Sequence, residues 1–124
     1  MGRSLLIAAA GAVGALARHH LQGLVNRFYA GAFPLGTFVV NVSGCFVLGV
    51  LSSALTERYA VHPDVRTALT VGLLGAYTTY STFALETVRA GEGGAPGIAV
   101  ANVAASVVAG LVAVRLGITV GRML

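Results

Sequence analysis

Hydroxyl side chains crowd one short segment of an otherwise apolar stretch. Positions 78–82 read Thr-Thr-Tyr-Ser-Thr, between Gly75 and Phe83. Serine and β-branched threonine weaken helix preference and compete for backbone groups, so we expect the helix to break here. Freed carbonyls can bind a cation, whereas freed N–H groups and hydroxyls can bind an anion. The alternative is a continuous helix whose hydroxyls donate back to its own carbonyls.

Two other apolar stretches carry polar residues at helical spacing. The first set is Thr37, Asn41 and Gly44, and the second, at intervals of four, is Asn102, Ser106 and Gly110. A buried asparagine in lipid is costly unless its amide is paired. Either set alone is explained by hydrogen bonds between neighbouring helices. Together with the hydroxyl run, however, the sets favour one polar track shared by three helices.

The residue types missing from these stretches indicate what such a track would carry. A proton-coupled transporter holds an ionisable side chain within a span, but here only Arg18 and Glu86 come close, each near the end of a stretch. The remaining donors are hydroxyls, amides and aromatic ring edges, whose hydrogens carry partial positive charge. These groups favour a small anion over a cation, and a channel over a proton-coupled transporter.

The composition places these stretches in a membrane. Of 124 residues, 56% are hydrophobic and 10% are charged, against about 25% charged in an ordinary soluble domain. Disorder is excluded by the same composition, since it requires low hydrophobicity and high charge. The eight basic residues are all arginines and are scattered, so no nucleic-acid partner is predicted. The single Cys45 cannot form a disulfide within the chain.

Four stretches are long enough to cross a lipid bilayer as helices, which takes about 20 apolar residues. They cover approximately residues 4–25, 35–56, 67–86 and 95–115. The first contains Arg18 and has an alternative interpretation as a secretory signal, but apolar helical spacing resumes beyond it at Leu21 and Leu24. We therefore predict an all-α membrane protein. Residues 1–124 would form a single four-helix channel subunit whose third helix is broken near the midplane.

Arginines are nearly balanced between the two sides of such a bundle. One side holds Arg3, Arg58, Arg66, Arg115 and Arg122, and the other holds Arg18, Arg27 and Arg89. Orientation follows an excess of Lys and Arg on the cytoplasmic side, so this weak bias predicts a chain that inserts both ways. An antiparallel homodimer would then supply the inverted half on which many transporters depend. The 17 glycines suit close helix contact at its interface.

Three motifs, in order, give the chain a family resemblance. They are Gly11-x-x-Gly14-Ala-x-x-Arg18 in the first span, Phe33-Pro-Leu-Gly36-Thr37-Phe-Val-Val-Asn41-Val-Ser-Gly44 in the second, and Gly72-x-x-Gly75-x-x-Thr78-Thr79-Tyr80-Ser81-Thr82-Phe83-x-x-Glu86 in the third. Over nearly its whole length the chain resembles the Fluc (CrcB) family of fluoride channels, although the fourth span fits more loosely. The resemblance implies a multi-pass protein of the cell inner membrane without enzymatic activity. It also implies an antiparallel dual-topology homodimer with two pores through which fluoride leaves the cytoplasm passively.

The same resemblance assigns roles to individual residues. Two phenylalanines that line each pore in the family map to Tyr80 and Phe83, where Tyr80 departs from the usual residue but keeps the ring edge. The polar groups of the pore map to Thr79, Ser81, Thr82, Ser106 and the Asn41 amide, and the basic residue of the vestibule maps to Arg18. The resemblance also implies a structural sodium ion (Na+) at the dimer centre, held by the backbone carbonyls of Gly75 and Thr78.

Two other functions fit a small four-helix membrane protein. A multidrug or guanidinium exporter would need a carboxylate in the first span to bind cations, and residues 4–25 contain none. A structural subunit without transport of its own would gain nothing from the hydroxyl-rich segment. The sequence therefore favours the fluoride channel over both.

Overall fold

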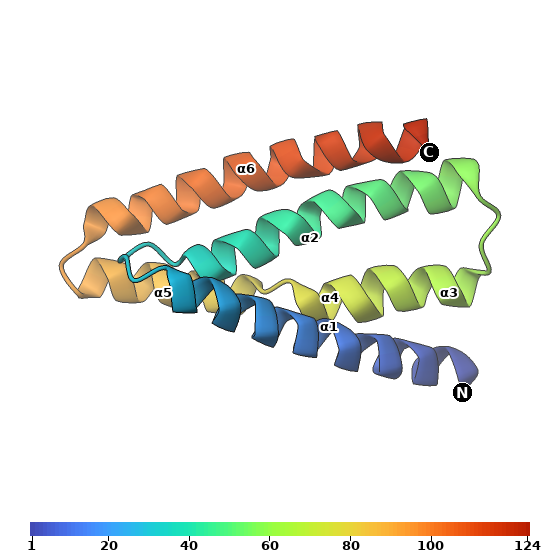
Figure 1. Cartoon of the computed structure of the whole chain (residues 1–124), viewed down its shortest axis with the longest axis horizontal. Helices are drawn as coiled ribbons and strands as arrows, with labels where there is room; N and C mark the ends of the chain where they lie inside the picture. Colours follow the sequence, from blue (N-terminus) through green and yellow to red (C-terminus); the bar gives the residue numbers. More distant parts are fainter.

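The structure, a computed structural model of residues 1–124, is built of helices without strands. Its elements are α1 (Gly2–Phe28), α2 (Leu35–Ser53), η1 (Ala54–Arg58), α3 (Pro63–Thr67), η2 (Ala68–Leu74), α4 (Gly75–Tyr77), α5 (Tyr80–Glu92) and α6 (Pro96–Met123). The elements η1 and η2 are π-helical. Together they form four rods, which are α1, α2 with η1, the run from α3 to α5, and α6 (Figure 1). The prediction of an all-helical chain is confirmed.

Three of the four rods are long and apolar enough to cross a membrane: Gly2–Phe28, Leu35–Arg58 and Pro96–Met123. The third rod, residues 63–92, is interrupted and contains no single helix of that length. The predicted spans 4–25, 35–56 and 67–86 lie within the first three rods. The last rod continues to Met123, beyond the predicted end at residue 115.

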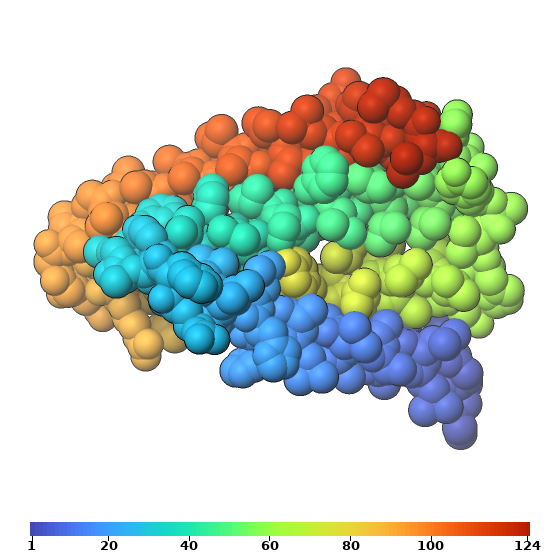
Figure 2. Space-filling model, in the orientation of Figure 1, coloured from blue at the N-terminus to red at the C-terminus, as the bar shows by residue number.

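The third rod lies in the middle of the bundle. Helix α2 packs along α6, and α1 packs along η2 and α4. Helices α1 and α6 form opposite edges of the molecule, with α2 and the third rod between them (Figures 1 and 2). Both termini lie at one end, near the turn that joins η1 to α3 (Figure 1). The middle of the third rod is therefore flanked by α1 on one side and α2 on the other.

Glycines bring α2 and α6 into backbone contact. A Cβ atom on Gly117 would lie 2.2 Å from the Phe46 carbonyl oxygen, and one on Gly49 would lie 2.4 Å from the Val114 carbonyl oxygen. Ser53 Oγ also donates to the Ile118 carbonyl oxygen at 3.1 Å. Small residues let helix backbones approach closely in a membrane protein. These glycines therefore serve the packing of α2 against α6 within the chain.

Replacing Gly117 by alanine is expected to destabilise the protein. The added Cβ collides with backbone of α2, which can yield only by separating the two helices. We expect the free energy of unfolding to fall by about 1–3 kcal/mol, the usual cost of overpacking, measured by circular dichroism in detergent. Gly97→Ala is the matched control on the same helix, since a Cβ there has no neighbour within 4 Å. Equal stability of the two variants would contradict this account of the α2–α6 contact.

The third rod breaks at Thr78 and Thr79, so the predicted interruption is confirmed. Both residues are extended, with φ −83° and ψ 159° at Thr78 and φ −147° and ψ 113° at Thr79. Helix α5 restarts at once because Thr79 caps it: its Oγ1 accepts from the Thr82 N–H at 3.2 Å. The break also lies close against α2, where a Cβ on Gly44 would be 2.3 Å from Thr78 Cγ2.

The single chain leaves most of its apolar surface uncovered. Only 17 of the 124 residues are buried, and large apolar side chains are exposed on every rod, for example Leu16 at 59%, Phe46 at 37%, Val71 at 61% and Leu111 at 67%. Apolar faces of this extent require lipid or another protein surface. The chain is therefore suited to a bilayer.

Candidate functional site

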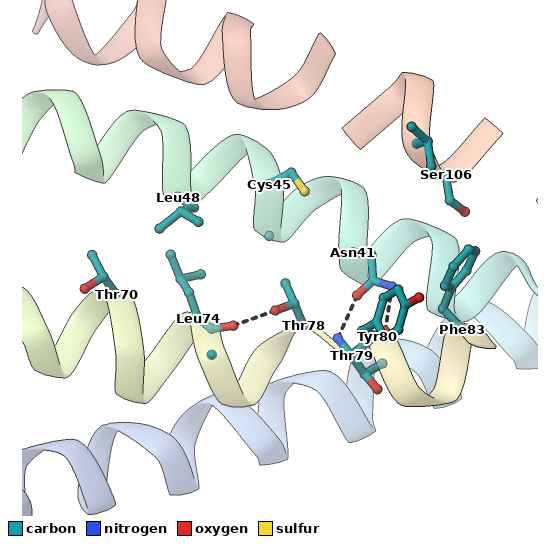
Figure 3. A pocket seen from close by; sticks show the side chains of 13 residues that line it. Asn41, Cys45, Leu48, Thr70, Leu74, Thr78, Thr79, Tyr80, Phe83 and Ser106 are labelled. Atoms are coloured by element: carbon teal, nitrogen blue, oxygen red, sulfur yellow. Dashed lines mark hydrogen bonds between the residues drawn. The ribbon is translucent and has the colours of Figure 1, made fainter. Parts of the chain in front are cut away.

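The side chain of Asn41 holds the broken segment in place. Its Oδ1 accepts from the Thr79 N–H at 2.8 Å, and its Nδ2 donates to the Thr79 carbonyl oxygen at 2.9 Å (Figure 3). Both backbone polar groups of Thr79 are thus satisfied by one amide from α2. Unpaired backbone groups would be costly in a bilayer. The Asn41 amide therefore stabilises the extended conformation of the break.

The break leaves the last carbonyls of α4 without their helical donors and gives the Thr78 carbonyl a new partner. In a continuous helix the Thr79 N–H would donate to the Gly75 carbonyl oxygen, but here it donates to Asn41. The Thr78 carbonyl oxygen accepts from Arg18 Nη1 at 3.4 Å. The Thr78 hydroxyl donates back to the Leu74 carbonyl oxygen at 2.9 Å. The back-donation that we considered as the alternative to a break therefore occurs at Thr78, the first residue of the break.

A groove of about 360 Å³ runs along the break, between α2, the third rod and α6. Its lining residues are Asn41, Gly44, Cys45, Leu48, Thr70, Leu74, Gly75, Thr78, Thr79, Tyr80, Phe83, Ser106 and Val107 (Figure 3). No carboxylate, ammonium, guanidinium or imidazole group lines it. The groove thus combines apolar walls with neutral amide and hydroxyl groups.

Two aromatic rings lie beside one another in this groove. The centroids of Tyr80 and Phe83 are 5.8 Å apart, and their planes are inclined by 50°. Tyr80 is 80% exposed in the single chain. The edges of such rings carry partial positive charge and the faces partial negative charge. The pair can therefore present edge hydrogens to an anion without a formal charge.

The groove brings together most of the predicted site residues. Those that line it are Asn41, Thr79, Tyr80, Phe83 and Ser106, with Gly75 and Thr78 from the predicted sodium site. Ser81 is exposed and lies outside the groove. Thr82 is engaged in the cap of α5, where its hydroxyl accepts from Thr79 Oγ1 at 3.0 Å. Arg18 also lies outside the groove and reaches the break through the Thr78 carbonyl.

A second polar chain joins three rods. Gln22 Nε2 donates to Thr37 Oγ1 at 3.0 Å, and Thr37 Oγ1 donates to Glu86 Oε1 at 2.9 Å. The other carboxylate oxygen of Glu86 is buried without a hydrogen-bond partner. Sequence reasoning missed Gln22, although it lies four residues after Arg18 and therefore on the same helical face. Thr37 carried a signal, since it lies four residues before Asn41 on the same face.

A third chain of hydrogen bonds joins α5 to α6. Asn102 Nδ2 donates to Thr87 Oγ1 at 2.9 Å, and Ser106 Oγ donates to Asn102 Oδ1 at 3.2 Å. The Asn102 amide thus makes the hydrogen bond between neighbouring helices that was the alternative to a shared polar track for this residue. Its partner Thr87 lies beyond the predicted end of the third span at residue 86, so the sequence did not single it out.

Comparison with known sequences places this site in a family. A sequence model described as "CrcB-like protein, Camphor Resistance (CrcB)" matches residues 5–118. The chain belongs to the CrcB family. This membership confirms the resemblance drawn from the motifs, and the chain is accordingly a multi-pass membrane protein and not an enzyme.

Individual CrcB relatives match along nearly the full chain. A protein of Solibacter usitatus is 48% identical over 118 residues, covering 95% of this chain and 97% of the relative. One of Geotalea uraniireducens is 45% identical over 120 residues, covering 97% of each. One of Citrifermentans bemidjiense is 43% identical over 124 residues, covering 100% of each. All three relatives bear the name "Fluoride-specific ion channel FluC".

Proposed function

We propose that this CrcB protein is a fluoride-selective ion channel through which fluoride leaves the cytoplasm passively. The observation that carries the proposal is the groove along the break, where the Asn41 amide, hydroxyls and two ring edges converge without any carboxylate or basic side chain. The names of its relatives point to the same ion. Export would lower intracellular fluoride and its toxicity, because fluoride enters acidified cells as neutral HF and dissociates inside.

Neutral donors suit the passage of a strongly hydrated anion. Removing water from fluoride in a low-dielectric environment is costly unless other donors replace it. The Asn41 NH₂ group has two hydrogens, of which one is given to the Thr79 carbonyl oxygen, so the second remains for an anion. Ring edges of Tyr80 and Phe83 would supply further weak donors. None of these groups carries a full charge that would trap the ion.

Arg18 would act on fluoride from outside the groove. Its guanidinium lies against the Thr78 carbonyl oxygen at 3.4 Å, so its positive charge is held next to the break. A fixed positive charge near a narrow path raises the local concentration of anions. For this reason we assign Arg18 to the vestibule, the entrance of the proposed pore.

The working assembly in this proposal is an antiparallel dual-topology homodimer in the cell inner membrane, with two pores. In the single chain the groove is open on one side, where the Tyr80 ring is 80% exposed. A second copy of the chain would close this open side. The near balance of arginines supports insertion in both orientations. Reporter fusions at the C-terminus test this part: activity on both sides of the membrane is expected, and a single location would contradict it.

A structural sodium ion at the dimer centre belongs to the same proposal. The Gly75 carbonyl fits this role, because its helical donor is diverted to Asn41 and no atom of another rod lies within 4 Å of a Cβ placed on Gly75. The Thr78 carbonyl fits less well, since the Arg18 guanidinium already faces it. Bound sodium would offset the carbonyl dipoles of both copies. Replacing sodium in the buffer by a large organic cation should lower the Tm of the dimer, whereas an unchanged Tm would argue against the ion.

Fluoride efflux from liposomes, followed with a fluoride electrode, tests the function directly. With potassium fluoride inside and valinomycin added so that K⁺ leaves with the anion and charge stays balanced, purified protein should release fluoride rapidly down its gradient without a proton gradient or added substrate. A guanidinium or multidrug exporter would instead require its cation on the opposite side, and a structural subunit would release nothing. Absence of fluoride release from liposomes that contain folded protein would rule the proposal out.

A further inference from the structure

Asn102, the most deeply buried polar side chain, links α6 to α5. It is 2% exposed and its Nδ2 donates to Thr87 Oγ1 at 2.9 Å. Thr87 Oγ1 in turn donates to the Phe83 carbonyl oxygen at 2.8 Å. At the other end of the amide, Ser106 Oγ donates to Asn102 Oδ1 at 3.2 Å. Four residues from two helices thus form one continuous chain of hydrogen bonds.

The donors in this chain all point in one direction, from Ser106 toward the Phe83 carbonyl. The Thr87 hydroxyl has one proton, which goes to that carbonyl, so Thr87 accepts from Asn102. The amide must then turn its NH₂ toward Thr87 and its oxygen toward Ser106. Bonds aligned in this way polarise and strengthen one another in a low-dielectric interior. The orientation of every group in the chain is therefore fixed by its neighbours.

Both ends of the chain reach the groove, although its middle does not. Phe83 and Ser106 line the groove, whereas Thr87 and Asn102 lie outside it. One end fixes the backbone that carries the Phe83 ring. The other end takes the hydroxyl proton of Ser106 and leaves only its lone pairs free. Since an anion needs proton donors, Ser106 can serve fluoride only by releasing Asn102.

We infer that Asn102, acting through Thr87 and Ser106, is a positioning residue for the fluoride path. This inference rests on the proposed function. Through Thr87, Asn102 fixes the position of the Phe83 backbone carbonyl. Asn102 also competes with the anion for the Ser106 hydroxyl proton. Because neither Asn102 nor Thr87 lines the groove, their effect on permeation has to pass through the two groove residues.

Single-channel recording in planar bilayers tests this role with a pair of variants at one position. Thr87→Val keeps the shape of the side chain but removes its hydroxyl, whereas Thr87→Ser keeps the hydroxyl. Thr87→Val removes the bond to the Phe83 carbonyl but leaves the Ser106–Asn102 bond, so only the positioning of Phe83 is lost. We expect it to lower the unitary fluoride conductance by about fivefold, which is the scale of one lost hydrogen bond, and Thr87→Ser to restore most of it. Unitary conductance does not depend on how many channels fold, so a merely structural role would leave it unchanged.

A matched control makes the same chemical change elsewhere. Thr119 Oγ1 donates to the Arg115 carbonyl oxygen at 3.1 Å on the exposed surface of α6, and Thr119→Val should conduct as the wild type does. Wild-type conductance in Thr87→Val would overturn the inference. Should Thr87→Val yield no dimer, Asn102→Ala decides in its place, and an unchanged unitary conductance there overturns it. If the wild type itself carries no fluoride current, the proposed function fails first.

Discussion

Replacing Asn41 by aspartate is expected to abolish fluoride efflux. The carboxylate would place an oxygen where Nδ2 now lies, 2.9 Å from the Thr79 carbonyl oxygen, so two acceptors would face each other. The new negative charge would also repel fluoride in the groove. We expect efflux from liposomes to fall by at least about a hundredfold, a rate change that corresponds to about 2.7 kcal/mol.

Asn26→Asp is the charge-matched control for this experiment. Asn26 is an exposed residue near the C-terminal end of α1, and it lies outside the groove. This variant should retain efflux, and both variants should be checked for dimer content by size-exclusion chromatography. Efflux at the wild-type rate from folded Asn41→Asp would contradict a path for anions past this amide.

Replacing Phe83 by alanine is expected to impair conduction more than assembly. Phe83 lines the groove and its ring centroid lies 5.8 Å from that of Tyr80, so its loss removes an edge donor and opens the path to water. We expect the unitary fluoride conductance to fall by about tenfold, equivalent to about 1.4 kcal/mol in the barrier. The fraction of dimer should change much less.

The matched control is Phe28→Ala, at the end of α1, where the ring is 84% exposed and far along the chain from the break. Phe28→Ala should leave conductance and dimer content as in the wild type. The opposite pattern for Phe83→Ala, a lost dimer with normal unitary conductance in the channels that remain, would show that Phe83 serves packing alone.

The position of the break was predictable because its cause is local. Four hydroxyl residues and a tyrosine at 78–82 weaken the helix wherever they stand. The partner that stabilises the break was not predictable in the same way. Asn41 lies 38 residues away from Thr79, and helical periodicity places it only on a polar face of its own helix. Its bidentate pairing depends on the rotation of α2 against the third rod.

Side-chain roles within the broken segment were the hardest to predict. Sequence reasoning treated Ser81 and Thr82 as part of the polar track. Because α5 begins at Tyr80, both residues are helical, and the helix sets the direction of each side chain. Thr82 enters the cap of that helix, and Ser81 is exposed in the single chain. Thr87 could not be found because its role comes from a bond to Asn102 across two helices. Contacts between rods, rather than patterns within one, therefore set the details of the groove.

The reversal potential of the purified channel in a planar bilayer tests the central claim most directly. The test uses a tenfold fluoride gradient and equal chloride on both sides. A passive fluoride-selective path should then give zero current at a membrane potential of about 59 mV, with the compartment that holds less fluoride negative. Reversing the fluoride gradient should reverse the sign. A reversal potential near zero under the fluoride gradient, or one that follows an imposed chloride gradient, would contradict the account.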